Sequence, residues 1–379
     1  MSQSRVRHSD IELGKPLPWD VYDEKGTLLL RIGYVINSES QVDKLVAIGV
    51  FADSTALRAT RLLQYEAEEQ EDTPASAAQG WTDLRKQMEQ LYAGLDASIA
   101  DRALANQVAE IAQRVDALCT ARPDLALAII SLRQEGRYST RHMLDTATVV
   151  RLAARAMKLP QAREQSLVCA ALTMNLGTTD FQDEIKKFTG TLSKAQVDQL
   201  HEHPSEAAKK LKAAGVTDAA WLRAVQDHHE HLDGSGYPRE LAGSDLHADA
   251  QIIRLADIYT ARITFREYSS AVALTIALRD ILQEGGKTVE APLAGQFIRA
   301  VGIFPPGLQL RLANGEKGVV VRAGSSPNHP IVISLVAADG APLTPGVYRD
   351  TQIAEYAVKE TIDPTTFNAY IDIDAIWGV

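Results

Sequence analysis

The sequence contains little cysteine, no long apolar run and no excess of positive charge. Its two cysteines, Cys119 and Cys169, exclude a disulfide framework and a cysteine-rich zinc site. Both lie in apolar stretches with a helical appearance, so we expect buried, reduced thiols. No run of about 18 apolar residues is present, and the first residues lack the apolar centre of a signal peptide. We therefore expect a cytoplasmic chain without a membrane span.

The charge balance is acidic, with a formal net charge of -10 and a sequence pI of about 5.4. Recognition of duplex DNA needs a basic face that neutralises phosphates, so duplex DNA is not an expected partner. A small anionic ligand held by a few arginines remains compatible with this balance. The apolar fraction of 45% is ordinary for a globular protein. At about 100–200 residues per domain, the 379 residues suggest two or three units.

The N-terminal part of the chain divides into two segments. Strand-like stretches flank the turn signal Asp23–Gly26, and a helix-like stretch over residues 38–48 ends at Gly49. We interpret residues 1–65 as a small α+β module with a sensory or docking role. Residues 66–80 are acidic, then rich in small side chains, and show no apolar period. They are interpreted as a linker.

The rest of the chain is mostly helical in pattern. Apolar residues repeat at helical spacing over residues 81–302, which predicts a helical domain with its core at 138–285. Strand-like runs around Asn314-Gly315 predict a small β-rich module over residues 303–379. The predicted fold class is therefore mainly α, a helical bundle between a small α+β module and a small β-rich module. The expected core helices cover residues 140–157, 164–175, 194–201, 205–214, 218–229, 247–263 and 270–284.

The most specific segment runs from His228 to Pro238 and reads HHEHLDGSGYP. His228 follows Trp221 and Val225 at helical spacing, so it continues the buried face of its helix. A buried imidazole needs a polar partner, and two adjacent histidines at a helix end can both face a metal ion. The glycines and the proline then force a tight, irregular turn.

Three further polar residues fall on apolar helix faces or at a helix junction. His142 shares a face with Thr146, and Asp257 follows Ile253 by four residues. His203 precedes a proline at a helix junction. A carboxylate on an apolar stripe is costly unless it is paired or bound to a metal. Taken singly, each residue is equally compatible with a structural role, as a satisfied core histidine or a helix-packing aspartate.

Together these residues resemble the HD-GYP subgroup of the HD-superfamily phosphohydrolases, from about Tyr138 to Val336. In that family an HD-type helical bundle holds two or three metal ions, commonly iron or manganese. The ions activate a water molecule that cleaves cyclic di-GMP to linear pGpG and often onward to GMP. The resemblance implies metal ligands at His142, His203, His228, His229 and Asp257, and a signature turn at Gly236, Tyr237 and Pro238. The segment GIFPPGLQLRLANGEKGVV, residues 302–320, also resembles the sequence that follows these domains.

The resemblance breaks where the family has its His-Asp pair and a following lysine. With Gly177 and Asp183–Ile185 as anchors, Met174 and Asn175 replace the pair and Thr178 replaces the lysine. A thioether is a poor ligand for iron(II) or manganese(II), and a neutral amide cannot offset the charge of two close cations. We therefore expect none of these positions to be catalytic. The expected cofactor is either none or a single iron- or manganese-type ion, instead of a full binuclear centre.

Two other departures bear on the ligands. Tyr138 stands where three-metal members can carry a glutamate, so a third ion is not expected. Family members often carry two cations after the last aspartate, whereas residues 265–269 read FREYS. Arg266 is the candidate contact for a phosphate there, with an exposed surface arginine as the equal alternative.

These features predict a degenerate HD-GYP protein in cyclic-di-GMP signalling, acting as a non-catalytic nucleotide-binding or interaction module. One alternative is a metal-dependent cyclic-di-GMP phosphodiesterase with a remodelled metal site. A second alternative is a structural scaffold whose histidines are packed in the core. The compatible partners are cyclic di-GMP, a diguanylate-cyclase-type protein domain at the GYP turn, and a second copy of the chain in a homodimer.

Overall fold

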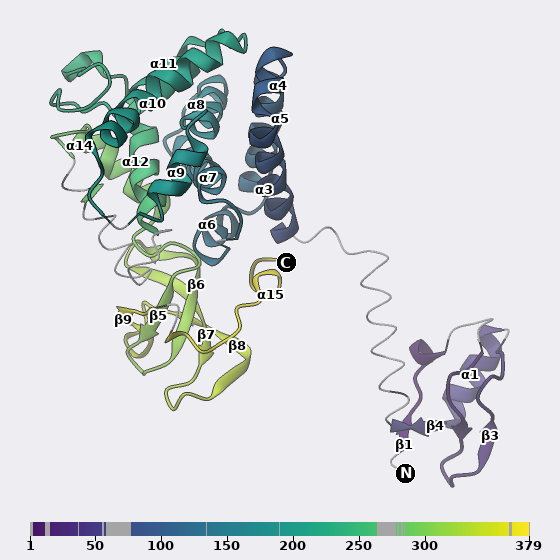
Figure 1. The fold of residues 1–379 in the computed structure, drawn as a ribbon. Coiled ribbons are helices and arrows are strands. Elements are labelled where there is room, and N and C mark those ends of the chain that lie inside the picture. Colours follow the sequence, from purple (N-terminus) through teal and green to yellow (C-terminus); the bar gives the residue numbers. More distant parts are fainter. Residues whose placement is uncertain are drawn as a thin grey trace. The chain divides into compact units, whose positions relative to one another are not determined.

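The chain forms two compact units, Met1–Ala75 and Ser76–Val379, each with its own hydrophobic core (Figure 1). Helix α3 begins at Ala77, so the last residues of the predicted linker are helical. No helix in the described part of the chain is long and apolar enough to cross a membrane. The computed structural model describes residues 3–11, 16–36, 38–54, 57, 77–133, 135–188, 190–263, 278, 280, 281, 283, 285–363 and 366–378.

The first unit is a small antiparallel sheet with one α-helix. The strand order is β1-β4-β2-β3, and helix α1 (Glu39–Ile48) ends where Gly49 adopts a positive φ of 71°. The predicted turn joins β2 to β3, and the Asp23 carboxylate accepts hydrogen bonds from the backbone of Lys25 and Thr27. This unit has the α+β character that the sequence predicts. Its strands are β1 (Gln3–Arg5), β2 (Val21–Tyr22), β3 (Leu28–Leu30) and β4 (Phe51–Asp53).

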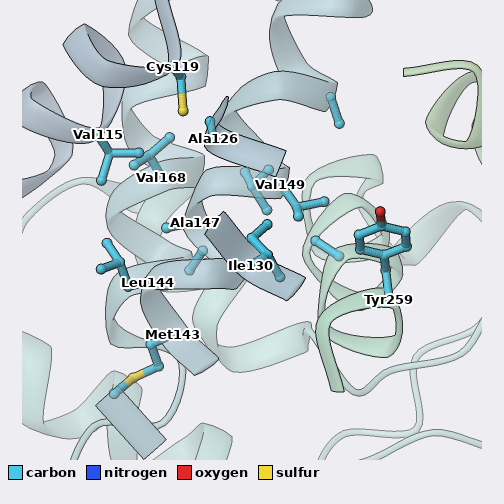
Figure 2. Close-up of a cluster of buried hydrophobic side chains, with 14 of the residues drawn as sticks. Val115, Cys119, Ala126, Ile130, Met143, Leu144, Ala147, Val149, Val168 and Tyr259 are labelled. Atoms are coloured by element: carbon cyan, nitrogen blue, oxygen red, sulfur yellow. The ribbon is translucent and has the colours of Figure 1, made fainter. Parts of the chain in front are cut away.

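The second unit is a helical bundle built around α7 (Tyr138–Ala156). Nearly every residue of α7 from Ser139 onward is buried, including polar ones, because helices α3, α5, α8, α12 and α14 all contact it. Figure 2 shows Met143, Ala147 and Val149 packed with side chains of neighbouring helices. The neighbouring helices are α3 (Ala77–Ala93), α4 (Leu95–Ala100), α5 (Leu104–Ala121), α6 (Pro123–Leu132), α8 (Gln161–Thr173), α9 (Thr179–Ile185), α10 (Lys194–Ala213), α11 (Ala219–Asp227), α12 (Ala248–Ile263) and α14 (Ala291–Val301).

A second antiparallel sheet closes the bundle at its C-terminal side, with the strand order β8-β7-β6-β5-β9 (Figure 1). It shares one continuous core with the helices, so residues 303–379 lie in the same compact unit as the bundle. Gly307 passes so close to α6 that a Cβ atom there would lie 2.9 Å from the Cα of Ala128. The remaining elements are β5 (Gln309–Leu312), β6 (Lys317–Ser326), β7 (His329–Val336), β8 (Pro342–Asp350), β9 (Val358–Thr361) and α15 (Ile373–Trp377).

The observed architecture confirms the predicted mainly α fold with two small β-containing parts. Two predicted helix bounds differ in ways that matter for the site. The expected helices over residues 194–201 and 205–214 are one helix, α10, which continues through Pro204, so His203 lies within a helix and not at a junction. The sequence predicts a helix over residues 164–175, but α8 ends at Thr173, and Met174 and Asn175 lie in the turn that follows. The expected helix over residues 270–284 lies mostly outside the described residues.

Candidate functional site

Three imidazoles meet where α10 approaches the C-terminal end of α11. One ring nitrogen from each of His203, His228 and His229 lies within 4.8 Å of the other two. His203 Nδ1 lies 2.6 Å from the carbonyl oxygen of Leu200, and His228 Nδ1 lies 2.7 Å from that of Val225. A carbonyl oxygen only accepts hydrogen bonds, so both rings carry their proton on Nδ1. Their Nε2 lone pairs then face each other at 3.3 Å.

This donor set fits a metal ion. Two nitrogens that each lie about 2.0–2.1 Å from one tetrahedral ion are separated by roughly 3.3 Å, which matches His203 and His228. The backbone carbonyls that hold Nδ1 are the type of partner that orients metal-binding histidines. Two bare lone pairs facing each other are otherwise unfavourable. A cation between them resolves that repulsion.

Burial also keeps the three imidazoles in the neutral form that binds metals. It lowers the pKa of His203 to about 3, with a contribution from the nearby His228. The pKa of His228 is lowered mainly by burial, although the charge of Asp257 opposes the shift. Burial and the other two histidines lower the pKa of His229 well below its usual range.

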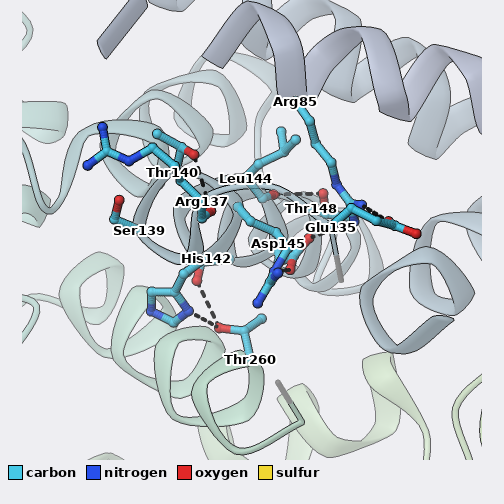
Figure 3. Close-up of polar contacts among 12 residues, drawn as sticks. Arg85, Glu135, Arg137, Ser139, Thr140, His142, Leu144, Asp145, Thr148 and Thr260 are labelled. Atoms are coloured by element: carbon cyan, nitrogen blue, oxygen red, sulfur yellow. Dashed lines mark hydrogen bonds and ion pairs between the residues drawn. The ribbon is translucent and has the colours of Figure 1, made fainter. Parts of the chain in front are cut away.

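His142 and Asp257 form a separate pair on α7 and α12. His142 Nε2 lies 2.7 Å from Asp257 Oδ1, and His142 Nδ1 lies 3.4 Å from the hydroxyl of Thr260. Figure 3 shows His142 beside Thr260, whose hydroxyl also lies 2.9 Å from that of Thr146. Burial acts to raise the pKa of Asp257, but the hydrogen bond and charge of His142, with His228, lower it on balance. Among the described residues, the group of three imidazoles does not include this pair.

The turn after α8 contains Met174 and Asn175, which the sequence resemblance predicts to stand in place of the family's His-Asp pair. Met174 is fully buried within the hydrophobic core. Asn175 is also buried, but it lines the pocket that His142, His203, His229 and Asp257 line.

The end of α8 is fixed by contacts from other helices and from its own turn. The hydroxyl of Tyr92 donates to the carbonyl of Leu172, and Trp221 Nε1 donates to the hydroxyl of Thr173. The Thr178 hydroxyl donates to the carbonyl of Asn175 at 3.0 Å. Thr178 is thus engaged within its own turn.

The Gly236-Tyr237-Pro238 turn packs against the imidazoles. A Cβ atom on Gly236 would overlap the backbone nitrogen of His231 and lie 2.5 Å from the Cα of Glu230, so only glycine fits. Tyr237 stacks on the imidazole of His229 with ring centroids 4.8 Å apart, and on His201 at 4.2 Å. The half-buried Tyr237 ring is therefore a wall of the site.

Two buried acids anchor this loop. The Glu230 carboxylate accepts the backbone N–H groups of Arg239 and Leu241, and Asp227 forms a two-pronged ion pair with Arg239. These contacts therefore join residues that precede the signature turn to residues that follow it. The loop's geometry follows from these contacts rather than from the turn residues alone.

A pocket of about 590 Å³ joins the two groups of side chains. Its walls include Tyr138, which stacks on His142, and Phe188 and Tyr237. Lys186 lies over the Tyr138 ring at 4.5 Å, and Arg262 lines the pocket from the last turn of α12. The pocket thus combines aromatic faces with cations.

No sequence motif predicts Lys186 or Arg262 as pocket residues. Lys186 follows a short helix, and Arg262 lies at the end of α12, five residues beyond Asp257. Five residues of a regular α-helix place Arg262 about 140° around the axis from Asp257, so helical periodicity does not predict that both line one pocket. Arg266, the predicted phosphate contact, lies outside the described residues.

Comparison with known proteins identifies the class of protein to which this fold and site belong. Residues 109–291 match the model of the HD domain, so this part of the chain is an HD domain. A solved HDG"Y"P protein from Bdellovibrio bacteriovorus superposes with a TM-score of 0.50 at 15% identity, covering 78% of this chain and 98% of that one. The HD-GYP-type fold expected from the sequence is therefore confirmed.

Curated relatives carry cyclic-dinucleotide activities in their names. A cyclic di-GMP phosphodiesterase of Pseudomonas aeruginosa is 26% identical over 212 residues, which are 56% of this chain and 51% of that protein. The cyclic di-GMP phosphodiesterase PdeB of Borreliella burgdorferi is 21% identical over 196 residues, 52% of each chain. A 3'3'-cGAMP-specific phosphodiesterase of Vibrio cholerae is 30% identical over 169 residues, 44% of this chain and 36% of that protein. The chain therefore spans about half or less of the length of these relatives.

Proposed function

We propose that this protein binds a cyclic dinucleotide of the cyclic-di-GMP class and hydrolyses it slowly or not at all. The observation that carries the proposal is the turn after α8. Two-metal phosphodiester hydrolysis needs a charged group that bridges the ions. At that place the chain offers a fully buried thioether, Met174, and a neutral amide, Asn175, which lines the pocket.

The pocket supports a nucleotide as the ligand. Its volume of about 590 Å³ falls in the ordinary range for small-molecule sites. Tyr138, Phe188 and Tyr237 offer aromatic faces on which bases stack, and Lys186 and Arg262 offer cations for phosphates. The named activities of the relatives point to the same ligand class.

A metal ion in this site would be held by His203, His228 and His229 and would supply a positive charge for a phosphate oxygen. The chain's own residues do the rest. Tyr237 packs against His229, and the Lys186 ammonium makes a cation–π contact with the Tyr138 ring at the pocket wall. These contacts would orient a bound nucleotide, and binding of this kind requires no catalytic step.

A second candidate function is an active metal-dependent phosphodiesterase with a remodelled centre. The three neutral imidazoles favour it, because a histidine-held ion can lower the pKa of a bound water on its own. A scaffold without any ligand is the third candidate. A partner domain such as a diguanylate cyclase would contact the exposed Arg239 and Glu240 beside the turn, because Gly236 is buried and Tyr237 faces the site.

One experiment separates these functions. Purified full chain is titrated with cyclic di-GMP by calorimetry, and the nucleotide is followed by chromatography after addition of iron or manganese. We expect saturable binding with slow formation of pGpG or none, and weaker binding in Lys186→Met. Rapid formation of many pGpG molecules per chain would establish the second function, and absence of binding by folded protein would leave the scaffold.

The double variant Met174→His, Asn175→Asp tests the reason for the lost turnover. If the turn alone limits the chemistry, the variant binds more metal per chain than the unchanged protein. Unchanged metal content would show that Thr178 and the wider pocket have diverged as well. The single variants, which restore one group each, are the matched controls.

A further inference from the structure

We propose that the site holds one divalent ion on His203, His228 and His229 alone, and that His142 and Asp257 form a hydrogen-bonded pair that does not bind it. The proposal rests on the proposed function for the pocket, but it concerns metal content and not the nucleotide. It also revises the five-residue ligand set that the sequence resemblance implies.

The hydrogen-bond partners distinguish the two groups of histidines. In His203 and His228 one nitrogen donates to a backbone carbonyl, and the other nitrogen faces a second imidazole. Neither ring can donate from both nitrogens unless it is charged, and burial disfavours that charge. A lone pair therefore remains on Nε2 of each ring, which is the atom a metal ion needs.

His142 has no such lone pair on its Nε2. Its Nε2 lies 2.7 Å from the carboxylate of Asp257, an acceptor, so that nitrogen carries a proton. Its Nδ1 faces the hydroxyl of Thr260 at 3.4 Å. That hydroxyl is in turn close to Thr146. His142 thus presents no bare Nε2 to an ion, and Asp257 Oδ1 accepts a hydrogen bond from it.

The charge of the site also favours one ion. Centres with two metals hold the ions roughly 3.5–4 Å apart, and a bridging anion offsets their repulsion. Asn175 lines the pocket with a neutral amide at the place where the family has that anion. Without it, a second cation beside His142 and Asp257 meets an uncompensated repulsion from the first.

Three neutral imidazoles define the preferred metal and its free position. Imidazole ligands suit zinc, whereas manganese(II) prefers carboxylate and water oxygens. A zinc ion with three histidines keeps a fourth position open, and the three ligands leave its double charge unbalanced. We therefore infer that an anionic oxygen of the phosphate class occupies the fourth position when a ligand is bound.

Metal content gives the direct test. The full chain is stripped with chelator, reloaded with zinc or manganese, desalted and measured by elemental analysis, with affinities from calorimetry. We expect one zinc per chain and at least about a hundredfold weaker binding in His203→Ala, since even the loss of a ligand's hydrogen-bond partner costs about 10–100-fold. Asp257→Asn and His142→Gln should keep one zinc with little change in affinity.

Two metal ions per chain would overturn the proposal, as would loss of the zinc in folded Asp257→Asn. Cobalt(II) loading of the unchanged protein keeps the test decisive if a variant unfolds. Intense visible absorption bands of a four-coordinate ion are expected, and the weak bands of a six-coordinate ion would contradict the inference. Binding of cyclic di-GMP is measured on the same samples, so failure of the proposed function shows separately.

Discussion

At the residue scale, hydrogen-bond partners decide what each histidine can do. His228 and His142 are both buried on apolar helices, and the sequence offers no distinction between them. In the structure His228 Nδ1 is held by a backbone carbonyl, whereas His142 Nε2 meets the carboxylate of Asp257. The first arrangement leaves a metal-binding lone pair on Nε2, and the second removes it from Nε2.

The two cysteines give a residue-scale prediction about reactivity. Burial raises the pKa of Cys119 to about 12, and burial together with the charge of Asp218 raises that of Cys169 to about 12. Since the thiolate is the nucleophile, neither thiol should react with a disulfide reagent in native protein at about pH 8. Both should react once the protein is unfolded. A fast-reacting thiol in the native chain would contradict the burial described here.

Gly236 provides a second prediction at this scale. Gly236→Ala forces the new Cβ into the backbone of Glu230 and His231, and overpacking of this kind costs about 1–3 kcal/mol of unfolding free energy. Denaturant unfolding measures the loss, and zinc affinity should fall with it because the loop begins at His229. Gly295→Ala in α14, where the nearest atom is 3.6 Å away, is the matched control and should not destabilise. Equal stability of the two variants would refute the close approach.

At the element scale, the first turn of α7 is held by a carboxylate from α9. Asp183 accepts hydrogen bonds from the backbone N–H of Ser139 at 2.9 Å, from the Ser139 hydroxyl at 3.1 Å and from Arg137 Nε at 2.9 Å. It thus does the work of an N-cap residue from a neighbouring helix. Figure 3 shows Arg137 and Ser139 at this end of α7, one turn before His142.

We expect Asp183→Ala to lower the free energy of unfolding by about 1–2 kcal/mol, because it leaves a helix N–H group without its acceptor. Asp180 also pairs with Arg137 but is 89% exposed, so Asp180→Ala should have almost no effect. Urea unfolding of both variants provides the comparison. Similar losses in the two would mean that the ion pair with Arg137, and not the helix cap, carries the stabilisation.

At the scale of the whole molecule, the chain has two separate hydrophobic cores. The core of the first unit includes Trp19 and Val42, and none of its members belongs to the core of the second. The sheet at the C-terminal side, in contrast, shares its core with the helices, and Trp377 Nε1 donates to the carbonyl of Val321. The second unit is thus a single body from α3 to α15.

A chain that begins at Ser76 should therefore fold by itself. Its melting temperature and zinc stoichiometry should match those of the second unit in the full chain, because the core and the three imidazoles remain intact. Removal of residues 303–379 should instead unfold the bundle, since it exposes the shared core. Differential scanning calorimetry distinguishes these outcomes. A truncation at Ser76 that fails to fold would show that the first unit is part of the same cooperative body.

The sequence alone determined the fold class and the position of the signature loop. Apolar residues at a helical period define the bundle, and the loop from His228 to Pro238 needs its glycines for steric reasons that are local to the chain. That Met174 and Asn175 depart from the family pattern stays a prediction from the sequence. These features depend on residues that are close together in the sequence, so a sequence pattern is enough to predict them.

Only the tertiary structure decided which side chains meet. His142 and Asp257 are 115 residues apart in sequence and 2.7 Å apart in space, and His203 and His228 come together only because α10 packs on α11. In the structure α8 also ends before Met174, and Tyr237 stacks on the imidazole of His229. Contacts of this kind follow from how helices pack, and the periodicity of a single helix carries no information about its partner's register.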